Sequence, residues 1–252
     1  AGELPAGSDE HPTKSKEVNR AAIPAHRTGF MRVTQGRARP CVGPTSIVPE
    51  SAGESPRPPR ICVGKQFAVL SSDMWSVIAH GGAKEIPPEK EEANRKGMAR
   101  ALEAGCRTMR CTQDALEAVI ATVKALEDDP TFNAGKGGAK RKDGTVELCG
   151  SVMTGHDLQA GAVASVPGLR NPVEVARLVH GQELVLMVGM GAYRFAAERG
   201  AELADHSYFD VEKEDDDHDT VGCVALDPQG RLAVATSTGG LDGVEAGRGG
   251  DS

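Results

Sequence analysis

The sequence of 252 residues has room for one large domain or two small ones, and its 39% of hydrophobic residues permits a substantial core, although aromatic residues make up only 3%. A formal net charge of -7 argues against non-specific binding of nucleic acid, which requires a basic surface. No apolar run approaches the roughly 18 residues that a membrane-spanning helix needs, so we expect neither nucleic acid nor a membrane as a partner.

Residues 1–73 differ in composition from the rest of the chain. They are rich in Pro, Arg, Ser and Gly, as in the stretches 37–40 and 55–60, and no apolar period is sustained. Such a composition buries too little apolar surface to offset the entropy of ordering, which predicts a segment that is disordered or extraneous to the fold. A functional basic arm is the alternative, although acidic residues largely offset the basic ones.

Regular structure is predicted from Met74 onward. The apolar run at 75–79 ends in His80-Gly81-Gly82, which is typical of a buried strand followed by a tight turn. A polar helix is expected over 88–109.

A second helix is expected after Thr112, whose hydroxyl is a suitable N-cap, with Asp114 favourably placed in the first turn. Pro130 ends this helix. Its apolar residues recur at helical spacing and should form one buried face made of Leu116, Val119, Ile120, Val123 and Leu126.

A third helix is expected to begin at Asn171-Pro172. Asn171 can cap it, Pro172 suits the first turn, and Glu174 can reach back to the amide of the cap residue. A strand over 184–188 and a helix over 191–203 should follow.

The acidic run 212–217 is interpreted as a solvated linker, which leads into a hairpin. Its strands are predicted at 221–226 and 232–236, joined by the turn Asp227-Pro228-Gln229-Gly230.

The junction of linker and hairpin carries the strongest candidate for chemistry. A threonine hydroxyl is a weak nucleophile that needs a base beside it. If the chain is cut before Thr220, the new α-amino group, with an ordinary pKa of about 7.7–8.0, can be that base. Arg248 can bind a substrate carboxylate and Asp251 a substrate ammonium. An ordinary strand threonine and a surface arginine are the alternative interpretation. Neither Gly189-Met190-Gly191 nor Gly135-Lys136-Gly137 completes a nucleotide-binding motif.

Six short motifs carry a family resemblance, and their order and spacing make it specific. They are VIAHGGA at 77–83, LEDDPTFNAG at 126–135, AGAV at 160–163, TVGCVALD at 220–227, ATSTGG at 235–240 and GRGGDS at 247–252. From about Met74 the chain resembles the plant-type L-asparaginase/isoaspartyl peptidase family of N-terminal nucleophile hydrolases.

The resemblance implies an α+β fold of the αββα sandwich type. It also implies that the precursor cleaves its own chain between Asp219 and Thr220. Residues 74–219 would form the α-subunit region and 220–252 the start of the β-subunit region. The two chains would form a heterodimer, and two heterodimers would associate. The implied reaction is hydrolysis of L-asparagine and of β-aspartyl (isoaspartyl) dipeptides through a β-aspartyl-threonine ester.

The resemblance also implies roles for individual residues. Thr220 would be the nucleophile and Thr238 would assist it. Substrate would be bound by Arg248, Gly249, Gly250 and Asp251. No cofactor is required, but a structural sodium ion is expected in a loop whose backbone carbonyls suit a hard cation; the loop residues are Leu126, Glu127, Asp129, Phe132, Ala134 and Lys136.

The sequence departs from the family pattern at several positions. Cys149 and Thr154 stand where the family usually has Asp, and Gly249 replaces a usual Val. The family's Thr-Gly-x-Gly segment has no counterpart before Ser252, so we expect a fold that is incomplete at the C-terminus and a chain with little activity as written.

Two alternatives stay open. One is a catalytically inactive, truncated homologue that acts through protein association. The other is glycosylasparaginase, a related lysosomal hydrolase. The start of the sequence shows no signal-peptide pattern, and six cysteines without CxxC pairs favour reduced thiols, so a cytoplasmic location is expected instead.

Overall fold

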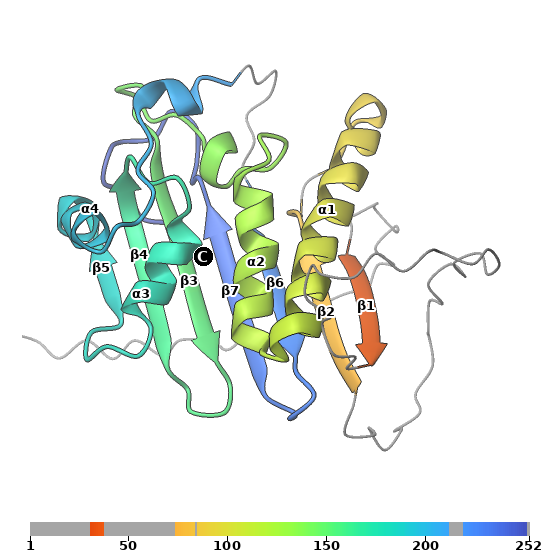
Figure 1. Ribbon diagram of the computed structural model, residues 1–252. Coiled ribbons are helices and arrows are strands. Elements are labelled where there is room, and N and C mark those ends of the chain that lie inside the picture. Colours follow the sequence, from red (N-terminus) through yellow and green to blue (C-terminus); the bar gives the residue numbers. More distant parts are fainter. Residues whose placement is uncertain (1–30, 38–73, 84, 212–218, 251–252) are drawn as a thin grey trace, which may run out of the picture.

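The computed structural model describes residues 31–37, 74–83, 85–211 and 219–250 (Figure 1). In chain order, the strands and helices are β1 (Met31–Arg37), β2 (Met74–His80), α1 (Pro88–Thr112), α2 (Ala115–Glu127), η1 (Gly135–Gly137), β3 (Glu147–Thr154), β4 (Ala160–Pro167), α3 (Pro172–Val179), β5 (Leu186–Val188), α4 (Gly189–Glu198), η2 (His206–Phe209), β6 (Val221–Leu226) and β7 (Leu232–Thr238).

The strands described form one seven-stranded sheet in the order β1-β2-β6-β7-β3-β4-β5. Neighbours pair antiparallel, except for β4 and β5, which are parallel. Strand β6 therefore lies inside the sheet, between β2 and β7, and the start of β6 at Val221 pairs with Ser237 near the end of β7. This register brings Thr220 next to Thr238.

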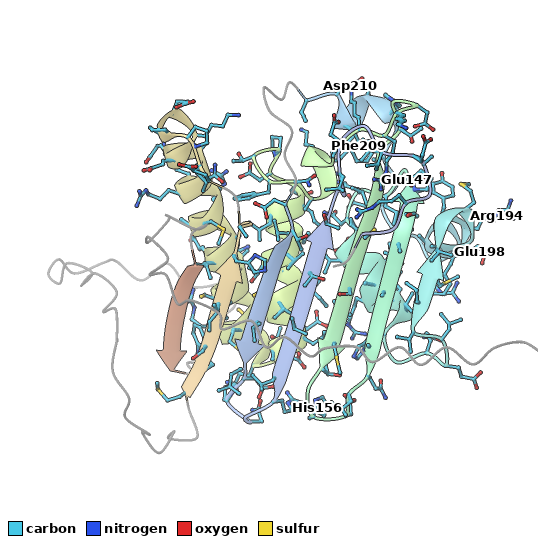
Figure 2. All side chains as sticks on the ribbon, turned by 180° about the vertical axis from the view of Figure 1, so that it is seen from behind. Glu147, His156, Arg194, Glu198, Phe209 and Asp210 are labelled. Atoms are coloured by element: carbon cyan, nitrogen blue, oxygen red, sulfur yellow. The ribbon has the colours of Figure 1, made fainter. Side chains whose placement is uncertain are left out.

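Helices α1, α2 and α3 cover one face of the sheet (Figure 1). Apolar side chains alternate along the strands toward this layer, as Val77 in β2 and Ala225 in β6 illustrate, and they are fully or almost fully buried against α1 and α2. Figure 2 views the sheet from the opposite side. The intervening residues Met153, Val224 and Leu232 alternate toward this face and are 36%, 43% and 50% exposed. The expectation of a mixed α and β fold is confirmed, and the described residues contain one sheet with helices. None of the helices described is long and apolar enough to cross a membrane.

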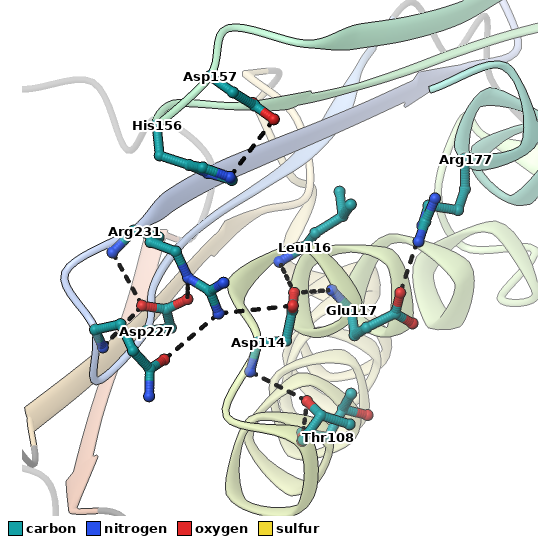
Figure 3. Close-up of polar contacts among 11 residues, drawn as sticks. Thr108, Asp114, Leu116, Glu117, His156, Asp157, Arg177, Asp227 and Arg231 are labelled. Atoms are coloured by element: carbon teal, nitrogen blue, oxygen red, sulfur yellow. Dashed lines mark hydrogen bonds and ion pairs between the residues drawn. The ribbon is translucent and has the colours of Figure 1, made fainter. Parts of the chain in front are cut away.

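Helix α2 has the predicted apolar face, but its predicted cap is wrong. Thr112 is the last residue of α1, and its hydroxyl donates to the carbonyl of Thr108 at 2.9 Å. Gln113, at a φ of 53°, ends α1. Asp114 is the N-cap instead, because its Oδ1 accepts from the amides of Leu116 at 2.8 Å and Glu117 at 3.2 Å (Figure 3).

Helix α3 begins at Pro172 as predicted but is capped differently. Asn171 makes no side-chain capping bond, and Glu174 pairs with Lys124 of α2 at 2.6 Å instead of reaching back. A carboxylate oxygen of Glu127, from the end of α2, accepts from the amide of Val173 at 3.0 Å. A residue distant in sequence thus supplies the capping acceptor.

Other boundaries differ from prediction by a few residues. The strand predicted over 184–188 is the shorter β5 in the structure. The helix predicted over 191–203 corresponds to α4, which begins earlier, at Gly189, and ends at Glu198. The hairpin is confirmed, with β7 extended to Thr238. Strand β1 lies within 1–73, where no regular element was predicted, and pairs with β2. The remainder of 1–73 and the acidic run 212–217 lie outside the described residues.

Cys149 and Cys223 are buried thiols. Cys111, near the end of α1, is disulfide-bonded, so the prediction of six reduced thiols is wrong there.

Candidate active site

The peptide bond before Thr220 is held by two hydrogen-bond donors. The carbonyl oxygen of Asp219 accepts from Asn133 Nδ2 at 3.0 Å and from Thr238 Oγ1 at 3.1 Å. Attack on this carbonyl would place negative charge on its oxygen, and preorganised donors at such distances stabilise that charge. The geometry is therefore suited to cleavage of the bond between Asp219 and Thr220.

Asn133 was not predicted as a site residue, yet it connects three segments. Its Nδ2 also donates to the carbonyl of Gly240 at 2.8 Å, and its Oδ1 accepts from the amide of Ala139 at 3.1 Å. The side chain is buried and its amide is fully engaged, so it cannot turn away from Asp219. Its place in the matched motif at 126–135 is the signal that could have found it.

The turn after β2 holds the side chain of Asp219. Oδ1 accepts from the amides of Ala83 at 2.7 Å and Thr220 at 3.0 Å. Gly82 has a φ of +118°, and a Cβ there would lie only 1.7 Å from Oδ2 of Asp219. The second glycine of the HGG motif is thus required both by its backbone conformation and by the close carboxylate.

His80, at the end of β2, is a second residue that the sequence reasoning did not assign to the site. It pairs with Gly222 of β6, and a Cβ on Gly222 would lie 2.5 Å from His80 Nε2. Burial lowers the pKa of His80 below its ordinary value, although the negative charge of Asp219 partly opposes this. A neutral imidazole therefore lies beside the candidate nucleophile at neutral pH.

An open pocket of about 480 Å³ brings several predicted residues together. Thr220 and Thr238 line it together with Arg248 and Gly250. Gly249 is exposed and is not among the lining residues. Asp251 lies outside the described residues. The described residues that line it are His80, Ala83, Asp219, Thr220, Thr238, Gly240, Leu241, Arg248 and Gly250.

The loop predicted to bind sodium connects α2 to η1. The carbonyls of Leu126, Asp129, Phe132 and Ala134 accept amides from within the loop at 2.9–3.3 Å, and the carbonyl of Leu126 also accepts from the amide of Asp128. The described residues contain no group of three or more His, Cys, Asp or Glu side chains that could hold a metal ion. Lys136 directs its ammonium over the ring of Tyr208, 5.4 Å from the centroid. Backbone carbonyl oxygens such as those of this loop are ligands that suit a hard cation.

The carboxyl of Glu127 is directed toward α3. Its Oε1 accepts from Val173, and its Oε2 is buried without a hydrogen-bond partner among the described residues. Burial raises the pKa of Glu127 to about 8, so that the side chain is mainly neutral at pH 7.

Comparison with known proteins identifies the family of the chain. A family model described as asparaginase matches residues 73–216 and 209–252. The bovine isoaspartyl peptidase/L-asparaginase is 40% identical over 196 residues, which cover 70% of this chain and 64% of the relative. The isoaspartyl peptidase of Escherichia coli (strain K12) is 39% identical over 209 residues, which cover 70% of this chain and 65% of the relative.

A plant relative, the probable isoaspartyl peptidase/L-asparaginase 2 of Arabidopsis thaliana, is 31% identical over 224 residues, with 71% of this chain and 69% of the relative covered. The chain thus spans just under two thirds of the length of the bovine and bacterial relatives. With a match over most of residues 73–252, the chain belongs to the asparaginase family of N-terminal nucleophile hydrolases.

Proposed function

We propose that the whole protein is an amidohydrolase that cuts itself before Thr220 and then uses this threonine as its nucleophile. The observation that carries the proposal is the pair of donors, Asn133 Nδ2 and Thr238 Oγ1, on the carbonyl oxygen of Asp219. Two side-chain donors on the carbonyl of the bond to be cut are the arrangement that an oxyanion formed at this carbonyl would need.

Self-cleavage proceeds in two balanced steps. The Thr220 hydroxyl attacks the carbonyl carbon of Asp219, the C–N bond breaks, and the hydroxyl proton passes to the released amine. Water then hydrolyses the resulting ester, which leaves a carboxylate on Asp219 and restores the Thr220 hydroxyl. Asn133 and Thr238 stabilise the oxyanion of the first step.

The freed α-amino group gives Thr220 a base that titrates near neutral pH. The hydroxyl attacks the side-chain amide carbon of L-asparagine or of a β-aspartyl dipeptide. Ammonia or an amino acid leaves, and water hydrolyses the β-aspartyl ester. Arg248 lines the same pocket and is suited to bind the substrate α-carboxylate bidentately. Asp251 would bind the α-amine.

The processing step is tested by intact mass and N-terminal sequencing of the purified protein. We expect a fragment beginning Thr-Val-Gly, and none from Thr220→Ala. Thr236→Ala is the matched control, because its hydroxyl contacts Ser151 at 2.8 Å and not Asp219. A Thr220→Ala variant that is still cut at this bond would exclude self-cleavage.

Substrate class is tested with β-aspartyl-leucine, L-asparagine and an N-glycosylated asparagine in parallel. Release of leucine or ammonia, lost in Arg248→Ala, supports the proposal. Turnover of only the glycosylated substrate would assign the protein to the glycosylasparaginases. A protein that is cut correctly but hydrolyses none of the three would be an inactive homologue.

Three further features of the family are proposed for the whole protein. The half-exposed apolar side chains Met153, Val224 and Leu232 support a second sheet packed on the open face, which would complete an αββα sandwich. Cleavage would yield α and β chains whose heterodimers associate in pairs. The carbonyl-rich loop at 126–136 would hold a sodium ion with a structural role, tested by comparing thermal unfolding in sodium and in choline chloride.

A further inference from the structure

Arg141 is a buried cation outside the pocket. It lies between η1 and β3, and its side chain has no exposed surface. Arginine is almost never fully buried unless its charge is paired or its donors are satisfied. The partners of Arg141 therefore indicate what the residue does.

Those partners belong to the base of the loop that carries Arg248. Nη2 donates to the carbonyls of Arg248 and Glu147, each at 3.2 Å, and Nη1 donates to the carbonyl of Leu241 at 3.5 Å. Leu241 and Arg248 are the first and last residues of the loop 241–248. One guanidinium thus bridges the two ends of this loop.

The guanidinium also packs against the backbone at the loop entrance. Gly240 has a φ of +76°, and a Cβ there would lie 2.8 Å from Nη1 and 3.2 Å from Cζ of Arg141. The approach is possible only because position 240 has no side chain. Gly240 lines the pocket, so Arg141 contacts the pocket wall from behind.

Glu147, which is labelled in Figure 2 and is the first residue of β3, supports the same arrangement. Its Oε2 lies 3.6 Å from Nε of Arg141 and accepts from the amide of Gly247 at 2.7 Å. Backbone bonds also connect Lys142 with Val244 at 3.0 Å and Gly243 with Lys140 at 2.9 Å. The loop is therefore anchored along its length, with Arg141 as the only fully buried charge among these contacts.

We propose that Arg141 is a positioning residue, which fixes the loop 241–248 so that Arg248 is held ready to bind the substrate carboxylate. This inference rests on the proposed function of Arg248. Arg141 contacts the main chain of Arg248 and contributes nothing to the chemistry directly. Its planar set of donors reaches several carbonyls at once, which a lysine cannot reproduce.

The first test does not depend on activity. Hydrogen exchange of the loop amides is compared in the wild-type protein, Arg141→Met, Arg141→Lys and Lys142→Met. The last variant removes an exposed ion pair, Lys142 with Glu245, which joins the same two segments. We expect the amides of 241–248 to exchange faster in both Arg141 variants than in the wild-type protein, with a larger increase in Arg141→Met than in Arg141→Lys. Exchange in the sheet should not change in either variant, and Lys142→Met should exchange like the wild-type protein. Equal protection of the loop amides from exchange in all four proteins would overturn the proposal. Failure of both Arg141 variants to fold would also overturn it, because Arg141 would then support the core as a whole and not this loop in particular.

The second test uses kinetics with β-aspartyl-leucine. Loss of alignment should raise KM by roughly 10- to 100-fold in Arg141→Met and leave kcat within about threefold, with partial recovery in Arg141→Lys. If Arg141 acts through Arg248, the double variant with Arg248→Ala should be no worse than Arg248→Ala alone. Multiplying effects, or a fall in kcat at constant KM, would contradict the positioning role. If the wild-type protein turns over none of the substrates, the proposed function fails, and the exchange experiment still decides whether Arg141 orders the loop.

Discussion

Replacement of Glu127 by glutamine should change how the stability of the protein depends on pH. The folded state raises the pKa of this carboxyl from 4.5 to about 8 because the group is buried. Between these two values the folded protein binds a proton that the unfolded chain does not. The stabilisation is therefore complete below the unfolded pKa and is lost as pH rises toward about 8.

The size of the effect follows from this difference in pKa. Each pH unit within the window changes the free energy of unfolding by up to about 1.4 kcal/mol, so the wild-type protein should lose about 2–3 kcal/mol through Glu127 between pH 5 and pH 7. Glutamine keeps an oxygen for the amide of Val173 and does not titrate. The variant should therefore gain stability relative to wild type as pH rises.

Urea unfolding at pH 5, 6, 7 and 8 measures this difference directly. The comparison of variant with wild type cancels the contributions of other titrating groups. Glu117→Gln makes the same chemical change at a half-exposed site on α2 and serves as the control. Parallel curves for wild type and Glu127→Gln across the range would refute the conclusion that the carboxyl is neutral in the folded protein at pH 7.

Three other changes test the local geometry. Asp114→Ala should destabilise the protein by about 1 kcal/mol through loss of the α2 cap, measured by chemical denaturation, and an equal loss in Thr112→Ala would mean that the cap is misassigned. Asn133→Ala should slow the appearance of the fragment beginning at Thr220 by roughly 10² to 10³, followed by gel electrophoresis, and an unchanged rate would remove the amide from the cleavage step. Gly82→Ala should also slow cleavage, because the new methyl group collides with the Asp219 carboxylate; normal processing would show that the turn can yield.

The elements that the sequence predicted best are those with a strong local pattern. Helix α2 repeats its apolar residues at helical spacing, and the β6–β7 hairpin combines two apolar runs with a Pro-and-Gly turn. Local pattern could not decide between Thr112 and Asp114, two possible capping residues that are two positions apart. Nor could it reveal that Glu174 binds Lys124, because that partner is 50 positions away.

The sequence indicated only part of the candidate site, because only some of its residues lie in a local motif. Thr220, Thr238 and Arg248 follow one another within a short stretch of sequence, and their motifs placed them. Asn133 and His80 reach the site from other elements through sheet register and loop packing. Arg141 gave no signal at all, because in the sequence a buried guanidinium looks like any other basic residue near a turn.

The position of β6 and β7 in the sheet determines what a cut before Thr220 would do to the molecule. Both strands are inserted between β2 and β3, which belong to the chain on the other side of the cut. Five residue pairs join β6 to β2, and six join β7 to β3. The two polypeptides would therefore be interleaved, so that neither could leave without breaking the sheet. A fully processed sample should migrate as two bands under denaturing conditions and as one particle in native buffer.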